Sequence, residues 1–168
     1  ERVVQAFNVP VIAFDEFEAD DVLATLAVAG RERGMEVVLC TSDKDCRQLL
    51  CNNVRMLNLR KKTYFDPASL KEDWGIAPDQ VIDYQSLVGD SVDNVPGVPG
   101  IGAKTAAQLL AEYGDLETLL ARASEIKQQK RRENLIQFAE QARLSKRLVT
   151  LDDRVAVEEP LASFAIDA

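Results

Sequence analysis

A glycine-rich turn between two predicted helices constrains this chain more than any other feature. The segment 89–106 reads GDSVDNVPGVPGIGAKTA, with glycines at 89, 97, 100 and 102 and prolines at 96 and 99. Glycine allows positive φ or a backbone free of side chains, and the prolines stiffen the turn. Apolar residues then recur at helical spacing until Gly114, a helix stop. A turn of this kind at a helix start presents bare amides, which is typical of a phosphate or other anion site.

Three interpretations of this turn compete with a purely structural corner between helices. A nucleotide-binding P-loop requires glycine directly before Lys-Ser/Thr, and here Ala103 separates Gly102 from Lys104. A dinucleotide-binding fold requires a strand before the glycines, but residues 78–90 have a helical pattern, with Pro78 suited to a first turn. The third pattern, helix, tight turn and helix, suits contact with a nucleic-acid backbone without reading bases.

Acidic clusters form the second feature of the sequence. They are Glu18, Asp20 and Asp21 in FEADD, Asp43 and Asp45 in TSDKD, and Asp90 and Asp93 in GDSVD. A single cluster is weak evidence, because acidic residues at a helix start are ordinarily caps or dipole partners. Apolar runs of strand length at 10–14 and 35–42 precede the first two clusters, with a helix predicted over 20–33. This order predicts a βαβ unit whose parallel strands place both clusters at one sheet edge.

The chemistry of these clusters follows from their charge. Carboxylates a few ångströms apart raise one another's pKa unless a cation neutralises them. Oxygen ligands without His or Cys favour Mg²⁺ or Mn²⁺, and the chain contains no histidine. Ser-His-Asp and Cys-His catalysis and the usual zinc sites are thereby excluded. Metal-assisted hydrolysis of a phosphoryl group fits instead, so the clusters and the turn together predict a nuclease.

Composition agrees with this prediction once the clusters are considered. The net charge of −8 argues against DNA binding, but neutralisation of the seven clustered carboxylates would leave about −1. Basic runs at 127–132 and 60–62 are candidates for backbone contact, although a solvated helix face is the more ordinary explanation of the first. The three cysteines form no CxxC pair, and no signal or membrane segment is recognisable. We therefore expect a cytoplasmic protein.

The chain divides into an α/β part and a helical part. We expect the α/β part over 1–77, with a short helix at 45–50 and a strand pair at 54–60 and 62–65. The helical part is expected over 78–150, and 151–168 as a linker to a following domain. Asp66-Pro67 predicts a helix that stops near Gly75, and Asp115 caps another. A long helix is expected over 133–147, with Leu135, Ile136, Ala139 and Leu144 facing inward.

Four segments resemble one known family. They are FEADDVLATLA, TSDKDCRQLL, the run WGIAPDQVIDYQSLVGDSVDNVPGVPGIGAKTAAQLL, and LSKRLVTLDDRV. In this order they are similar to the 5′ nuclease (5′–3′ exonuclease) domain of bacterial DNA polymerase I, a relative of flap endonucleases. The resemblance extends from residue 1 to about residue 158. It implies an α/β fold, a parallel-sheet, PIN-like nuclease core followed by a helix-three-turn-helix DNA-binding element.

The resemblance also implies an activity and a site. The activity is structure-specific 5′–3′ exonuclease and flap endonuclease cleavage in primer removal and repair, on DNA with 5′ flaps, nicks or primers. A covalently linked polymerase domain is implied, and no membrane partner. The implied two-metal site, for Mg²⁺ or Mn²⁺, is Glu18, Asp20, Asp21, Asp43, Asp45, Asp90 and Asp93. Of these, Glu18, Asp21, Asp43 and Asp45 are implied as catalytic. The implied DNA contacts are Gly97, Gly100, Ile101, Gly102, Lys104 and Thr105, with K⁺ at the hairpin.

The chain departs from this family at its start. The family's first strand carries a metal-binding aspartate in an L-x-D-G setting, and a second early aspartate and a basic helical arch follow. The chain begins without Met, at ERVVQAFNVPVIAF, and shows none of these. We therefore expect an N-terminally truncated fragment that is catalytically impaired, and whose uncovered sheet edge allows self-association. The alternative is a non-catalytic DNA-binding module that uses the hairpin alone.

Overall fold

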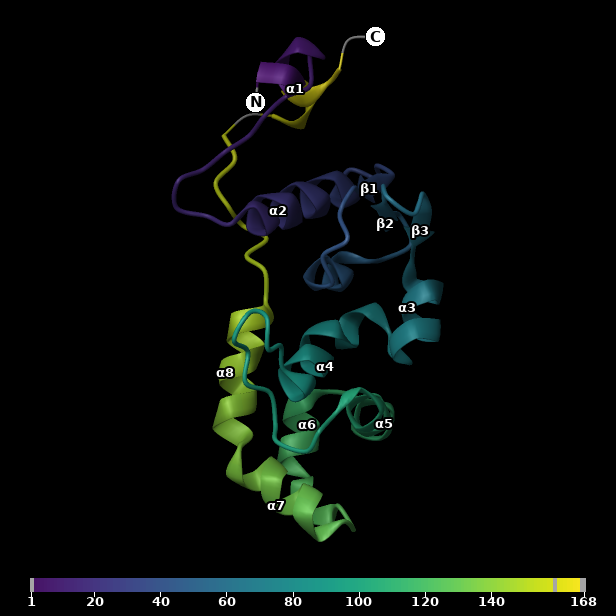
Figure 1. The fold of residues 1–168 in the computed structure, drawn as a ribbon, viewed down its shortest axis with the longest axis vertical. Coiled ribbons are helices and arrows are strands. Elements are labelled where there is room, and N and C mark those ends of the chain that lie inside the picture. The colour runs from purple at the N-terminus through teal and green to yellow at the C-terminus, as the bar shows by residue number, and fades with distance from the viewer. Residues whose placement is uncertain (1, 159, 167–168) are drawn as a thin grey trace.

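The computed structural model describes residues 2–158 and 160–166 (Figure 1). An α/β part comes first, with helices α1 (Arg2–Ala6) and α2 (Ala19–Glu32) and a small sheet of β1 (Val37–Leu39), β2 (Val54–Asn58) and β3 (Thr63–Phe65). A 3₁₀ helix, η1 (Asp45–Leu49), connects β1 to β2. Figure 1 shows α2 and the sheet on one side of the molecule and the later helices on the other. No helix of the described residues is both long and apolar enough to cross a membrane.

The sheet is mixed, in the order β1-β2-β3. β1 pairs in parallel with β2, with Val38 opposite Arg55, and β2 pairs antiparallel with β3, with Leu57 opposite Tyr64. The predicted strand pair at 54–60 and 62–65 is therefore confirmed. Because β1 and β2 run parallel, the carboxyl end of β1 lies at a sheet edge where ligands commonly bind.

The strand predicted at 10–14 is wrong. The structure assigns no strand there, and the parallel partner of β1 is β2 instead. The segment lines an apolar cleft of about 530 Å³ together with α2 and β1. An apolar, β-branched run becomes a strand only where a neighbouring strand accepts its hydrogen bonds, and none of the described strands lies beside this one.

The helical part begins at α3 (Pro67–Trp74). It continues through η2 (Pro78–Gln80), α4 (Val81–Val88), α5 (Ala103–Tyr113), α6 (Leu116–Ala121), η3 (Ala123–Glu125), α7 (Gln129–Gln137), α8 (Ala139–Val149) and η4 (Leu161–Phe164). The predicted end signals are confirmed: Asp66 accepts a hydrogen bond from the Ser69 amide, and Asp115 from the Thr118 amide, each at 2.8 Å. Gly75 ends α3 at a φ of 76°. Local sequence thus determines these boundaries.

The single helix predicted over 133–147 is wrong. The chain leaves helical geometry at Phe138, where φ is −103° and ψ is 20°, and this break separates α7 from α8. Leu135 is fully buried as expected, but Ile136 and Leu144 are 57% and 43% exposed. The periodicity argument assumed one straight axis, and the break changes which positions face the core.

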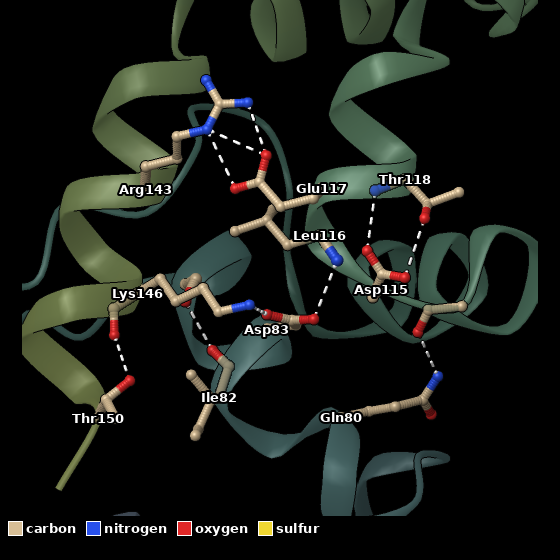
Figure 2. A network of polar contacts seen from close by, with 12 residues as sticks. Gln80, Ile82, Asp83, Asp115, Leu116, Glu117, Thr118, Arg143, Lys146 and Thr150 are labelled. Atoms are coloured by element: carbon tan, nitrogen blue, oxygen red, sulfur yellow. Dashed lines mark hydrogen bonds and ion pairs between the residues drawn. The ribbon is translucent and has the colours of Figure 1, made fainter.

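A network of polar contacts joins α4, α6 and α8 (Figure 2). Asp83, buried on α4, accepts a hydrogen bond from the Leu116 amide at 2.9 Å and pairs with the Lys146 ammonium at 2.7 Å. Further out, Arg143 of α8 pairs with Glu117 of α6 at 2.7 Å. A buried carboxylate needs such partners, since an unpaired charge is costly in the interior. The network fixes the three helices that support the glycine-rich turn.

The segment after α8, which we predicted to be a linker from residue 151, contacts α2 in its first part. Figure 1 shows it rising from α8 past the start of α2. The Asp152 amide donates to Oδ1 of Asp21 at 2.9 Å, and the Val155 amide donates to Oγ1 of Thr25 at 3.0 Å. Val155 is buried. Residues 151–155 therefore attach the end of the helical part to α2.

Candidate metal centre and nucleic-acid interface

The first acidic group lies where α2 starts and β1 ends. Asp20 occupies the first turn of α2, and Asp43 and Asp45 follow β1. Burial raises the pKa of Asp20, and the negative charges of Asp43 and Asp45 raise it further. Because Asp20 responds to the charges of the other two, the three carboxylates form one electrostatic group. The structure thus brings together the two clusters that the sequence predicted at one edge.

Asp43 and Asp45 are held by local hydrogen bonds. The Asp43 amide donates to Oγ1 of Thr41, and Oδ1 of Asp43 accepts from the Asp45 amide, both at 3.0 Å. Oδ1 of Asp45 accepts a hydrogen bond from the side-chain amide of Gln85, which lies on α4. Burial raises the pKa of Asp45, and the bond from Gln85 opposes that shift. The loop after β1 is therefore fixed by hydrogen bonds within itself and by one from α4.

The second acidic group surrounds the ammonium of Lys44. Oδ2 of Asp90 contacts Lys44 Nζ, while Oδ2 of Asp93 lies at 3.5 Å and Oδ1 of Asp45 at 3.9 Å. The hydrogen bond from Lys44 holds the pKa of Asp90 below its usual range. Backbone hydrogen bonds between Asp90 and Val95, at 2.7 and 2.8 Å, close the loop that carries both aspartates. Asp45 belongs to both groups and connects them.

The remaining two predicted ligands lie at the margin. Glu18 precedes α2 and adds to the negative potential at Asp20, while Asp21 accepts the hydrogen bond from the Asp152 amide. Across residues 2–158 and 160–166, no three acidic, cysteine or histidine side chains are arranged as ligands of one ion. The residues nevertheless fit a cation, because an ammonium already lies among three of the carboxylates.

The thiol of Cys46, which directly follows Asp45, is not part of this chemistry. Cys46 is buried in η1, and burial raises the pKa of its thiol to about 12. A thiol with this pKa stays protonated near neutral pH and does not act as a thiolate ligand. The donor set is therefore oxygen, which agrees with the preference for hard divalent ions expected from the sequence.

Sequence reasoning missed two residues at this site. Lys44 lies within TSDKD, and its position between two predicted ligands was the available signal. Gln85 lies on the helix before the glycine-rich turn and carried no signal of its own. Its side chain is 4% exposed, and its Oε1 accepts no hydrogen bond from the described residues.

The glycine-rich turn lies between α4 and α5. Gly97 and Gly100 adopt positive φ, 60° and 78°, as their predicted turn role requires. Gly102 does not: its φ is −96°, and a Cβ there would meet nothing within 4 Å. Gly102 caps α5 without a side-chain hydrogen bond. The first amides of this helix therefore receive no side-chain cap at its positive end, next to the open space at Gly102.

The other predicted DNA contacts of the turn differ in exposure. Lys104 is exposed and Thr105 half-buried in the first turn of α5, next to the open space at Gly102. The Ile101 side chain is buried in the core, and its amide donates to the Val98 carbonyl at 3.0 Å. The Gly97 amide donates to Oγ of Ser145 at 3.3 Å. Ile101 and Gly97 thus shape the turn, and residues 102–105 form its open surface.

The fold is that of an α/β, resolvase-like nuclease domain followed by a helical, SAM-like region. The family model described as "5'-3' exonuclease, N-terminal resolvase-like domain" matches residues 1–75, and that described as "5'-3' exonuclease, C-terminal SAM fold" matches residues 76–168. The chain belongs to the 5′–3′ exonuclease family. The fold class and the family predicted from the sequence are confirmed.

Relatives of the chain are DNA polymerases I. It is 48% identical over 166 residues to the DNA polymerase I of Rhizobium leguminosarum, covering 99% of this chain and 16% of the relative. It is 38% identical to that of Bacillus caldotenax, covering 98% of this chain and 19% of the relative. The chain thus spans less than a fifth of the length of these relatives and is similar to their 5′–3′ exonuclease part.

Solved structures agree with the fold. A T5 5′-exonuclease with bound zinc is similar at a TM-score of 0.77 and 26% identity, covering 85% of this chain and 53% of that chain. The T5 D15 flap endonuclease in a pseudo-enzyme-product complex with DNA and metal ions is similar at a TM-score of 0.79 and 24% identity, covering 90% of this chain and 56% of that chain. The second likeness concerns the fold alone.

Proposed function

We propose that this chain is the metal-dependent 5′ nuclease part of a DNA polymerase I. It hydrolyses phosphodiester bonds of DNA or RNA at 5′ flaps, nicks and primed ends, with two Mg²⁺ or Mn²⁺ ions. One observation carries this proposal: carboxylates from α2, from the end of β1 and from the loop after α4 converge on Asp45. Bound zinc in the T5 5′-exonuclease and the identity to DNA polymerases I support it.

The two groups suggest how the ions would be held. Asp20, Asp43 and Asp45 would hold one ion, and Asp45, Asp90 and Asp93 the other, with Glu18 and Asp21 adding negative potential. When bound, such ions would supply a water of lowered pKa and positive charge next to the phosphoryl group. The chain itself supplies orientation: the side-chain amide of Gln85 holds Asp45, and the Thr41 hydroxyl holds the loop at Asp43.

The turn supplies the second part of the function. The first amides of α5 and the Lys104 side chain would hold phosphates of the duplex without reading bases. The family resemblance also implies K⁺ at this hairpin. The carbonyl oxygens of Gly97, Val98 and Pro99 already accept hydrogen bonds within the protein, so we assign no step of binding to K⁺.

The test of this function is the metal dependence of cleavage. In a full-length DNA polymerase I that contains this chain, EDTA is expected to abolish cleavage of a 5′-flap substrate while flap binding persists, and added Mg²⁺ is expected to restore cleavage. The 168-residue chain alone is expected to bind duplex and to cleave at background rate. Cleavage that survives EDTA contradicts the mechanism. Binding without cleavage in the full-length protein favours a non-catalytic DNA-binding module.

The substitution Gly102→Val tests the turn. A valine side chain at this position would fill the open space in front of the first amides of α5, and the backbone there suits any residue. We expect duplex affinity to fall by about tenfold for all base sequences alike, since phosphate contacts carry no sequence information. The slope of log affinity against log salt should become shallower by about 0.9 for each phosphate that the variant no longer binds. Fluorescence anisotropy at several salt concentrations measures both.

The control for this substitution is Ala111→Val, an exposed position further along the same helix. It adds a similar side chain away from the turn, so affinity should stay at the wild-type value. A folded Gly102→Val variant with unchanged affinity would support the structural-corner interpretation of the turn. A decrease confined to particular base sequences would also contradict the phosphate role.

A further inference from the structure

Lys44 is a basic residue whose ammonium lies among the aspartates of the second acidic group. Lys44 directly precedes η1, and its side chain reaches across to the loop after α4, where Nζ contacts Oδ2 of Asp90. The same ammonium lies within 4 Å of carboxylate oxygens of Asp93 and Asp45. Among the described residues, no other basic side chain forms an ion pair with these three aspartates.

The buried carboxylate oxygen that Lys44 contacts has no other donor among the described residues. This oxygen is Oδ2 of Asp90. Oε1 of Gln85 is a second buried oxygen without a donor among the described residues. Buried acceptors without donors are costly and rare in native proteins. A buried carboxylate oxygen that depends on Lys44, together with a buried amide oxygen that has no donor, indicates a place shaped for a positive charge.

An ammonium and a divalent ion cannot share this place, because like charges a few ångströms apart repel strongly. Any ion that takes Asp45, Asp90 and Asp93 as ligands must first displace Lys44. While no metal is bound, Lys44 offsets part of the negative charge of the three carboxylates and holds the loop after α4 next to η1. Loss of the ammonium would leave the carboxylates to repel one another.

We propose that Lys44 is a displaceable internal cation, which occupies the position of one metal ion in the metal-free chain and leaves it when the ion binds. This inference rests on the proposed function. Lys44 thereby lowers the apparent affinity for one of the two ions, since only the fraction of molecules with the ammonium displaced can bind it. Lys44 also keeps the loop after α4 in place while no metal is bound. The site therefore rearranges little when a metal ion binds.

The experiment compares the wild-type 168-residue chain with Lys44→Met, Lys44→Arg and Lys130→Met. Methionine keeps the length of the side chain and removes its charge, arginine keeps the charge, and exposed Lys130 on α7 controls for the change in net charge. Mn²⁺ is titrated, and free Mn²⁺ is measured by electron paramagnetic resonance. We expect Lys44→Met to bind Mn²⁺ about tenfold more tightly than wild type, while the other two variants do not.

Thermal unfolding supplies a second measurement. Without metal, Lys44→Met is expected to unfold at a lower temperature than wild type, and Mn²⁺ should raise its unfolding temperature more than that of wild type. Equal Mn²⁺ affinity in Lys44→Met and wild type overturns the role of Lys44 and leaves the metal site intact. An equal gain in Lys130→Met assigns the effect to net charge and also overturns it. Absence of Mn²⁺ binding in every variant overturns both the inference and the metal site.

A measurement on the wild-type chain does not depend on how the variants fold. The ¹⁵N signal of the Lys44 ammonium, assigned by its loss in Lys44→Arg, is followed during titration with Mg²⁺. Displacement is expected to shift this signal and to speed the exchange of its protons with water. A Lys44 signal that stays unchanged at saturating Mg²⁺ would contradict the proposal.

Discussion

Replacement of Asp45 by asparagine is expected to lower the single-turnover rate of flap cleavage at least about a hundredfold in a DNA polymerase I that contains this chain. Asp45 is the carboxylate common to both acidic groups, so its loss affects both ions. Asparagine has nearly the same shape and still offers an oxygen to the side-chain amide of Gln85. Flap affinity should stay near wild type. Rapid-quench cleavage at saturating Mg²⁺, beside a binding titration, measures the two effects separately.

The matched control is Asp79→Asn, an exposed aspartate in η2 outside both acidic groups. It should cleave at the wild-type rate. If Asp45 only supports the first turn of η1, Asp45→Asn would cost about 1 kcal/mol of stability and leave the chemistry unchanged. Wild-type turnover of the variant would therefore refute its assignment to the metals.

Substitution of Gly97 by alanine is expected to destabilise the chain by at least about 4 kcal/mol, or to prevent folding. Gly97 has a φ of 60°, and a Cβ there would lie 2.6 Å from the Gly89 amide nitrogen and from the Val88 carbonyl. These are backbone atoms at the end of α4, and they cannot move without disturbing the loop that carries Asp90. The strained φ and the overlap act together. Urea unfolding of the 168-residue chain measures the decrease in stability.

Gly102→Ala is the control for this substitution, because its Cβ would meet nothing within 4 Å and its φ is negative. It should change the free energy of unfolding by less than about 1 kcal/mol. A decrease below about 1 kcal/mol in Gly97→Ala would show that the turn can open without cost. The close approach of Gly89 and Gly97 would then not fix the position of the loop that carries Asp90.

Local signals made much of the fold predictable. A cap at Asp66, a stop at Gly75 and a cap at Asp115 each depend on a few neighbouring residues, and the structure shows them as expected. The helix break at Phe138 has no such signal, because it depends on how α8 packs against α4. The strand expected at 10–14 failed for a related reason: its formation requires a neighbouring strand, which its own sequence cannot specify.

The acidic site was predictable in part. The closeness of Asp20 to Asp43 and Asp45 was predicted, although the strand at 10–14 on which that prediction rested is absent and the parallel partner of β1 is β2. The position of Lys44 depends on the path of the loop after α4, which no local pattern determines. The assignment of all seven carboxylates to metals stays a prediction.

The hydrogen bond from the Asp152 amide to Asp21 joins residues 131 positions apart in the sequence. Because synthesis starts at the N-terminus, Asp21 is made early and Asp152 is made late among these residues. Closing so large a loop costs entropy and slows folding relative to local helices. The start of α2 therefore acquires its final support only when nearly all of these residues have been made. During synthesis, the helices of the 78–150 region can form before the acidic edge is complete, so the surface that would hold a duplex precedes the surface that would cut it.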